Sequence, residues 1–151
     1  MSGVKMRVSI VVACAVTLHL SLLTLHSQAK PATYKGLEVT PLSVERARNV
    51  ALIDCPPGTN TVRGNAREGE EFAVVNLAFK VTPAFNKDTI VKKPTLTDAS
   101  GKTYNTSVSI IDAGSVAEYK CAFPFRVPAG TKVASVAIDT ATIDIASLDK
   151  Q

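Results

Sequence analysis

The side chains best suited to nucleophilic, acid–base or transition-metal chemistry are gathered at the start of the chain. Both histidines (His19 and His26), both methionines and Cys14 lie within the first 29 of the 151 residues. Residues 30–151 therefore contain no imidazole to serve as the base of a Ser-His-Asp or Cys-His nucleophile. Copper and zinc sites on β-sandwich scaffolds also need His and Met ligands. We therefore expect no catalytic residues, no metal and no cofactor.

Carboxylates are the groups left for acid–base or cation chemistry after residue 29. Asp98 and Ser100 could contribute to a calcium site, although a tight turn explains Asp at 98 and Gly at 101 without a cation. A hydrolase that uses two carboxylates is therefore the third of our hypotheses for function. We expect the other acids of interest to face solvent: Glu68, Glu70, Glu71, Asp139, Asp144 and Asp149.

Residues 1–29 have the three parts of a secretory signal peptide. Lys5 and Arg7 form a basic head, residues 8–25 carry no charged side chain, and small side chains precede a cleavage site between Ala29 and Lys30. Two alternatives stay open: the apolar run could anchor the chain in a membrane, or Cys14 could be lipidated. We predict a secreted or periplasmic protein that contacts the membrane only transiently, through this segment.

Export decides what the two later cysteines do. In an oxidising compartment, Cys55 and Cys121 are the one intramolecular pair that residues 30–151 offer, and we expect a disulfide between them. The alternative is two separate buried thiols. A reactive cysteine is disfavoured because no His is present to lower its pKa.

The composition of residues 30–151 favours β-structure, since Val, Ile and Thr far outnumber Leu and turn residues recur at short intervals. The clearest strand spans 117–128, where Tyr119, Cys121 and Phe123 share one face by alternation. Prolines at 124 and 128 cannot donate to a ladder, so they place this strand at a sheet edge or beside a bulge.

Other segments complete a sandwich. The first half of 71–82 is apolar on both faces, which predicts a central strand. The alternation of apolar residues changes phase across Pro41, which predicts a bulge there. We expect about seven strands in one all-β domain over 30–151. The remaining assignments are a long polar connection over 55–69, a hairpin of 94–97 with 103–106, and closing strands at 133–138 and 143–148.

Three motifs carry a resemblance to a known family: EEFAVVNL at 70–77, LTDASGKTY at 96–104 and FPFRVPAG at 123–130. Together they resemble the telokin-like, immunoglobulin-like sandwich domains of secreted bacterial proteins, similar in fold to a mycobacterial immunoprotective extracellular antigen. The resemblance implies an immunoglobulin-like β-sandwich and an exported location, and it offers no catalytic residues. Unlike antibody domains, the chain has no Trp, and Cys55 precedes Pro-Pro-Gly. We therefore expect a link from a loop to the inner face near Cys121.

Our leading hypothesis is an exported, non-enzymatic binding domain whose partner is a protein or glycan outside the cytoplasm. Loops at one end of the sandwich or an exposed sheet edge would make the contact, and Tyr34, Phe85 and Tyr104 form the candidate binding patch. The alternative is a structural or assembly accessory protein of the cell envelope that docks by strand addition. Removing Lys5 and Arg7 leaves a formal net charge of +2, which argues against nucleic acid as a partner.

Overall fold

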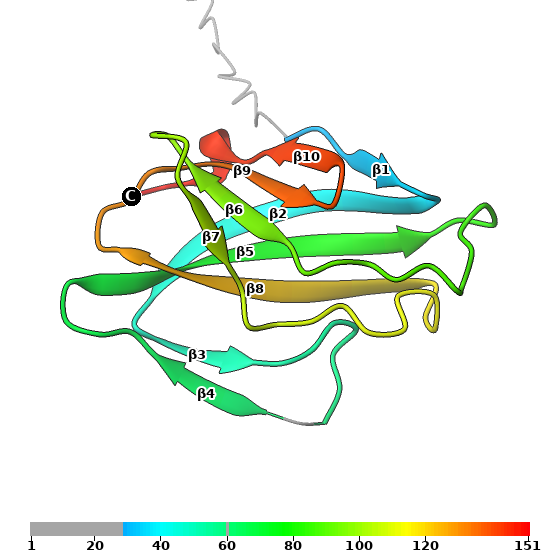
Figure 1. The fold of residues 1–151 in the computed structure, drawn as a ribbon, viewed down its shortest axis with the longest axis horizontal. Coiled ribbons are helices and arrows are strands. Elements are labelled where there is room, and N and C mark those ends of the chain that lie inside the picture. Colours follow the sequence, from blue (N-terminus) through cyan, green and yellow to red (C-terminus); the bar gives the residue numbers. More distant parts are fainter. Residues whose placement is uncertain (1–28, 60) are drawn as a thin grey trace, which may run out of the picture.

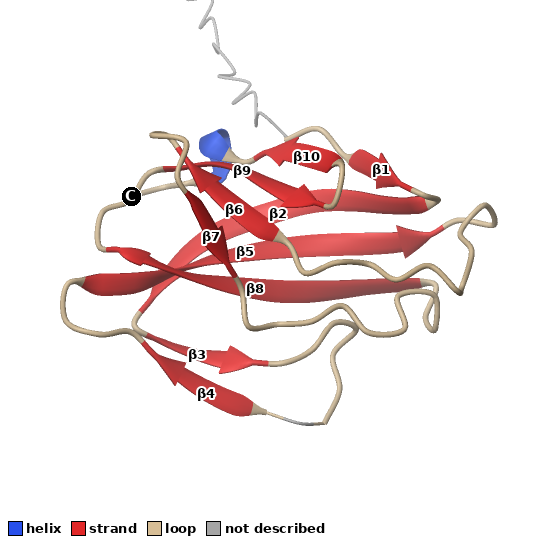
Figure 2. Cartoon of the chain, in the orientation of Figure 1, coloured by secondary structure: helices blue, strands red, loops and turns tan. Residues whose placement is uncertain are grey.

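The structure is a computed structural model that describes residues 29–59 and 61–151, so residues 1–28 of the expected signal peptide lie outside it. Two four-stranded antiparallel sheets face each other (Figure 1), and a two-stranded hairpin stands apart from them. The predicted all-β sandwich is therefore confirmed. Nearly all the regular structure is strand (Figure 2).

The described part of the chain contains ten strands, more than the seven expected. The first sheet has the order β1 (Ala32–Tyr34), β2 (Leu37–Ala47), β5 (Glu70–Val81) and β8 (Glu118–Pro128). The second has the order β10 (Ala141–Asp144), β9 (Val133–Ile138), β6 (Thr95–Asp98) and β7 (Thr103–Asn105). The separate hairpin pairs β3 (Asn49–Leu52) with β4 (Val62–Asn65), and a short 3-10 helix η1 (Ala146–Leu148) follows β10.

The two sheets are held together by side chains at every second strand position. On β8 the alternation predicted from the sequence is confirmed, because Tyr119, Cys121 and Phe123 are buried while their neighbours at 118, 120 and 122 are exposed. Phe79 of β5 stacks on the Tyr119 ring at 5.1 Å between centroids. The facing sheet, together with Ile145 just after β10, contributes buried aliphatic side chains to the same core: Leu96, Val133, Val136, Ile138 and Ile143. Burying each such side chain stabilises the fold by about 1.5–3 kcal/mol.

The positions of the long strands also agree with the sequence. β5 lies between β2 and β8 in the middle of the first sheet, and β8 forms its edge, as Pro124 and Pro128 require. The far side of β8 is not left open, since Thr106 bridges Phe125. The predicted bulge is present in β2, where the register with β5 shifts between Pro41 and Ser43.

The polar connection predicted over 55–69 is wrong in part, because its second half forms β4 and pairs with β3. These strands are short and mostly exposed, so their sequences lack the alternation that marks buried strands. The hairpin covers the outer face of β5 at Phe72, and a Cβ on Gly64 would lie 3.3 Å from the Phe72 Cζ atom. This contact explains why the start of β5 is apolar on both faces.

The closing segment differs from expectation as well. The strand predicted over 143–148 ends at Asp144 and is followed by η1, after which Asp149 reaches back to β2. The Arg46 guanidinium donates to both carboxylate oxygens of Asp149 at 2.6 Å and to Glu71 Oε1 at 3.0 Å.

The prediction that Asp149 faces solvent is therefore wrong, because its side chain is 5% exposed and ion-paired. Glu71 is likewise ion-paired, while Asp144 is exposed as expected.

We predict that Asp149→Asn lowers the free energy of unfolding by about 3 kcal/mol, because the largely buried Arg46 guanidinium loses its more buried carboxylate partner and retains only Glu71. Asp144→Asn is the matched control at an exposed site, and it should change the free energy by less than about 0.5 kcal/mol. Urea denaturation followed by circular dichroism measures both. Equal effects of the two substitutions would contradict the assignment of the ion pair.

Candidate functional site

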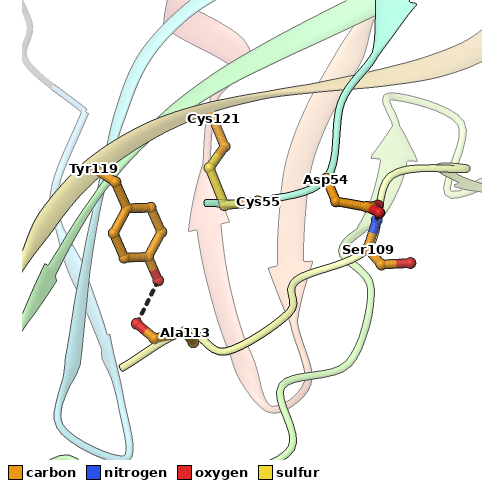
Figure 3. Close-up of a disulfide and its surroundings, with 6 residues drawn as sticks. All are labelled: Asp54, Cys55, Ser109, Ala113, Tyr119 and Cys121. Atoms are coloured by element: carbon orange, nitrogen blue, oxygen red, sulfur yellow. Dashed lines mark hydrogen bonds between the residues drawn. A yellow bond between two sulfur atoms is a disulfide. The ribbon is translucent and has the colours of Figure 1, made fainter. Parts of the chain in front are cut away.

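A disulfide joins Cys55 to Cys121, with an S–S distance of 1.99 Å and 5.7 Å between the Cα atoms (Figure 3). Cys121 lies on the inner face of β8, whereas Cys55 is fully buried in a segment outside the named strands. The pairing is therefore present as predicted, and it runs from a loop to the inner face of a sheet.

The disulfide segment also holds the loop between β7 and β8, residues 106–117. The Cys55 N–H donates to Ser109 O at 2.8 Å, and the Ile111 N–H donates to Cys55 O at 2.7 Å. Asp54 Oδ1 accepts a bond from the Ser109 N–H at 2.9 Å. Tyr119 donates its hydroxyl hydrogen to Ala113 O at 2.9 Å (Figure 3), and burial raises the pKa of this phenol to about 12. Two loops are thus fixed against β8.

Beside this segment, a groove of about 600 Å³ runs along the outer face of the first sheet. Its floor is a cross-strand row of small or short side chains, in which Ser43 of β2 pairs with Asn76 of β5 and Asn76 pairs with Ala122 of β8. One wall is β3 with the chain that follows it, from Asn49 to Pro57. The groove is open above these three positions because their side chains are short. The disulfide between Cys55 and Cys121 of β8 holds the segment that forms the wall in place.

The groove carries both polar and apolar groups. The Asn76 side-chain NH2 group donates hydrogen bonds to Ser43 Oγ at 2.9 Å and to Glu45 Oε1 at 2.8 Å. These bonds fix the orientation of the Asn76 amide on the groove floor. Glu45, Asp54 and Lys120 are exposed, so the lining carries two negative charges and one positive charge. Such a surface can bind an extended polypeptide in which polar and apolar side chains alternate.

The candidate patch of Tyr34, Phe85 and Tyr104 is wrong as an exposed surface. Tyr34 and Phe85 are 4% and 8% exposed, and Tyr104 is half-buried. Phe85 fits beneath two glycines, since a Cβ on Gly36 would lie 2.5 Å from the Phe85 nitrogen and one on Gly114 would lie 3.0 Å from its ring. These aromatic residues fasten loops to the core, which sequence position alone does not reveal.

Tyr34 and Tyr104 each donate a hydroxyl hydrogen bond to an aspartate, and these bonds explain the orientation of both side chains. Tyr34 donates to Asp139 Oδ2 at 2.7 Å, and this bond, supported by Lys92, lowers the pKa of the Asp139 carboxyl. Tyr104 donates to Asp98 Oδ2 at 2.9 Å, and burial together with that bond raises the pKa of the Tyr104 phenol. Asp139 has a φ of 51°, so these contacts also hold a left-handed turn residue in place.

Asp98 closes the hairpin turn between β6 and β7, at the place where the sequence predicts a turn. Its Oδ1 accepts bonds from the Ser100 N–H at 2.9 Å, the Ser100 hydroxyl at 2.7 Å and the Lys102 N–H at 2.9 Å. These hydrogen bonds, that of the Ser100 hydroxyl foremost, lower the pKa of the Asp98 carboxyl to about 2. Within residues 29–59 and 61–151, no group of three or more His, Cys, Asp or Glu side chains could hold a metal ion.

The groove has no signal in the sequence, because its floor residues are short, ordinary strand residues from three separate strands. The apolar side chains that the loops do expose, which are Ile90, Ile111 and Val116, were also not predicted from the sequence. Ile90 is 87% exposed although the next residue, Val91, is buried. The sequence signal that could have indicated Ile90 is its position next to Val91 in a largely polar loop, because adjacent side chains of an extended segment point in opposite directions.

Comparison with known proteins gives a limited result. No family model matches the chain, and no curated protein matches it. Among solved structures, it is similar to an uncharacterized β-sandwich protein from Clostridium difficile 630, with 13% sequence identity and a TM-score of 0.44, over 73% of this chain and 83% of that one. Among the described residues, no helix has the length and apolar character needed to cross a bilayer.

We predict that native, unreduced protein has no titratable thiol among residues 30–151. Replacing both Cys55 and Cys121 by Ser should lower the free energy of unfolding by about 4 kcal/mol, because the disulfide spans 66 residues of the unfolded chain. Ellman titration and denaturant unfolding measure the two effects. Two free thiols in the native exported protein would refute the link.

A second prediction concerns acid stability. The pKa of Asp98 is lower in the folded state than its ordinary 3.8, so its contribution is complete above pH 3.8 and is lost as the pH falls towards about 2. The stability difference between wild type and Asp98→Asn should therefore shrink across this interval. Urea unfolding at several pH values measures it, and a difference that is constant from pH 5 to pH 2 would contradict the hydrogen-bonded turn.

Proposed function

We propose that the protein is an exported, non-enzymatic binding domain that receives an extended segment of a partner protein in the groove beside the disulfide. The observation that carries this proposal is the groove itself, with a floor of Ser43, Asn76 and Ala122 and a wall tied to β8 through Cys55. A wall held by a covalent bond is already ordered before binding, which reduces the entropy lost when a partner docks.

A protein partner fits the exposed chemistry better than a glycan does. Sugar rings are commonly held against exposed aromatic faces, and every aromatic side chain of this chain is buried except the half-buried Tyr104. The groove instead offers an amide, charges of both signs and apolar patches such as Val50 and Ile53. These groups match backbone and side chains of a polypeptide.

Three observations support export as part of the proposal. Residues 1–29 have the pattern of a signal peptide, the paired cysteines suit an oxidising compartment, and the sequence motifs resemble those of telokin-like secreted domains. A secreted or periplasmic location is compatible with the described structure.

One observation favours the alternative role of an envelope assembly protein. β1 covers β2 at Leu37–Val39, and Asp149 touches it at Val44. Between these contacts, residues 40–43 pair with β5 on one side but have no strand partner on the other side within the described parts of the chain. A hollow of about 840 Å³ lies beside this stretch and includes the exposed Leu42. An added strand could pair there.

Site-specific photo-crosslinking distinguishes these roles. With a benzophenone side chain at Ala51, which is exposed on the groove wall, irradiation in envelope extracts should give an adduct of defined mass, whereas the same group at exposed Ala99, in the turn of the other sheet, should not. Ala122→Arg should reduce capture of that partner at least about tenfold, since it fills the floor. An adduct from a benzophenone at Leu42 with none from Ala51 would favour strand addition. Equal adducts at Ala51 and Ala99 would refute the groove as the binding site.

A further inference from the structure

The loop between β5 and β6, residues 82–94, lies alongside the loop between β7 and β8. At one end, Lys93 Nζ is 3.3 Å from Ser107 O, and at the other a Cβ on Gly114 would lie 3.3 Å from Lys87 Cγ. The two segments are therefore antiparallel neighbours, and Ile90 lies across from the stretch that includes Ile111. We call Ile90, Ile111 and Val116, which are 87%, 51% and 48% exposed, the loop strip.

Buried or hydrogen-bonded neighbouring residues keep the side chains of the loop strip exposed to solvent. Val91 and Ile110, each next to a strip residue, are buried, as is Phe85. The Ile111 N–H donates a hydrogen bond to Cys55 O. The Thr89 N–H donates to Asn86 O, which closes a turn just before Ile90. The strip residues thus stay in water while their neighbours are fixed, and exposed apolar side chains that lie together can mark a contact surface.

Charge is distributed unevenly along the loop strip. Asp88 and Asp112 are exposed at the end marked by Lys87 and Gly114, and they lie across from each other in the antiparallel arrangement. Lys92 and Lys93 are exposed at the other end, and Asp139 pairs with Lys92. One end is therefore net acidic and the other is basic, with Ile90 and Ile111 between them.

We propose that the loop strip is a contact between two copies of this chain. A two-fold axis through Ile90 and Ile111 sets the strip against itself, so that the Asp88 end of each copy meets the Lys93 end of the other. Ile90 and Ile111 of each copy are then buried against the same residues of the other copy, and both charge contacts are attractive. Three side chains per copy make a small interface, so the dimer is weak and forms at high local concentration. This inference goes beyond the proposed function and uses different residues.

Sedimentation velocity of the purified exported protein, from about 10 μM to about 1 mM, tests the contact. The weight-average mass should rise towards that of a dimer, and Ile90→Asp should weaken association at least about tenfold. Ala99→Asp is the matched control, since Ala99 is exposed in the β6–β7 turn, at the opposite end of these strands from both loops. A wild type that stays monomeric throughout, or equal weakening by both substitutions, would overturn the proposal.

A charge exchange tests the two-fold arrangement itself. Asp88→Lys and Lys93→Glu should each weaken self-association, because each places like charges at both contacts. A mixture of the two variants should associate about as well as wild type, since both contacts of the mixed dimer are again attractive. Circular dichroism checks that each variant is folded. A mixture that associates no better than either variant alone would refute the antiparallel pairing, and it would leave the groove proposal unaffected.

Discussion

The covalent link from Cys55 to Cys121 is the constraint on which both proposed surfaces depend. It fixes a segment that belongs to no sheet against the inner face of β8. That segment then hydrogen-bonds Ser109 and Ile111 on one side and continues β3 on the other. The groove wall and the exposed position of Ile111 both follow from this one attachment, because Cys55 is the one buried residue among residues 53–59.

Much of the framework was predictable from the sequence, because burial on one face of a strand imposes alternation on the residues. This rule located β8 through Tyr119, Cys121 and Phe123, and the prolines of β8 placed it at an edge. The phase change at Pro41 identified the bulge, and Asp98 with Gly101 identified the β6–β7 turn. Each of these features is set by a local physical requirement.

The surfaces were not predictable, because they depend on contacts between segments far apart in the chain. Phe85 was expected to be exposed, but two glycines at 36 and 114 let it enter the core. Asp149 was expected to be solvated, but Arg46 lies beside it only after β2 and the C-terminal segment have met. Short exposed strands such as β3 and β4 carry no alternation, so their pairing appears only in the folded chain.

Hydrogen–deuterium exchange of the oxidised and reduced protein, under conditions in which both are folded, tests the central claim most directly. The amides of Cys55 and Ile111 are bonded across the disulfide segment, whereas the ladder between β5 and β8 does not depend on it. We predict that reduction accelerates exchange at Cys55 and Ile111 by at least about tenfold while Val75 stays protected. Unchanged protection at Cys55 and Ile111 after reduction would contradict the account.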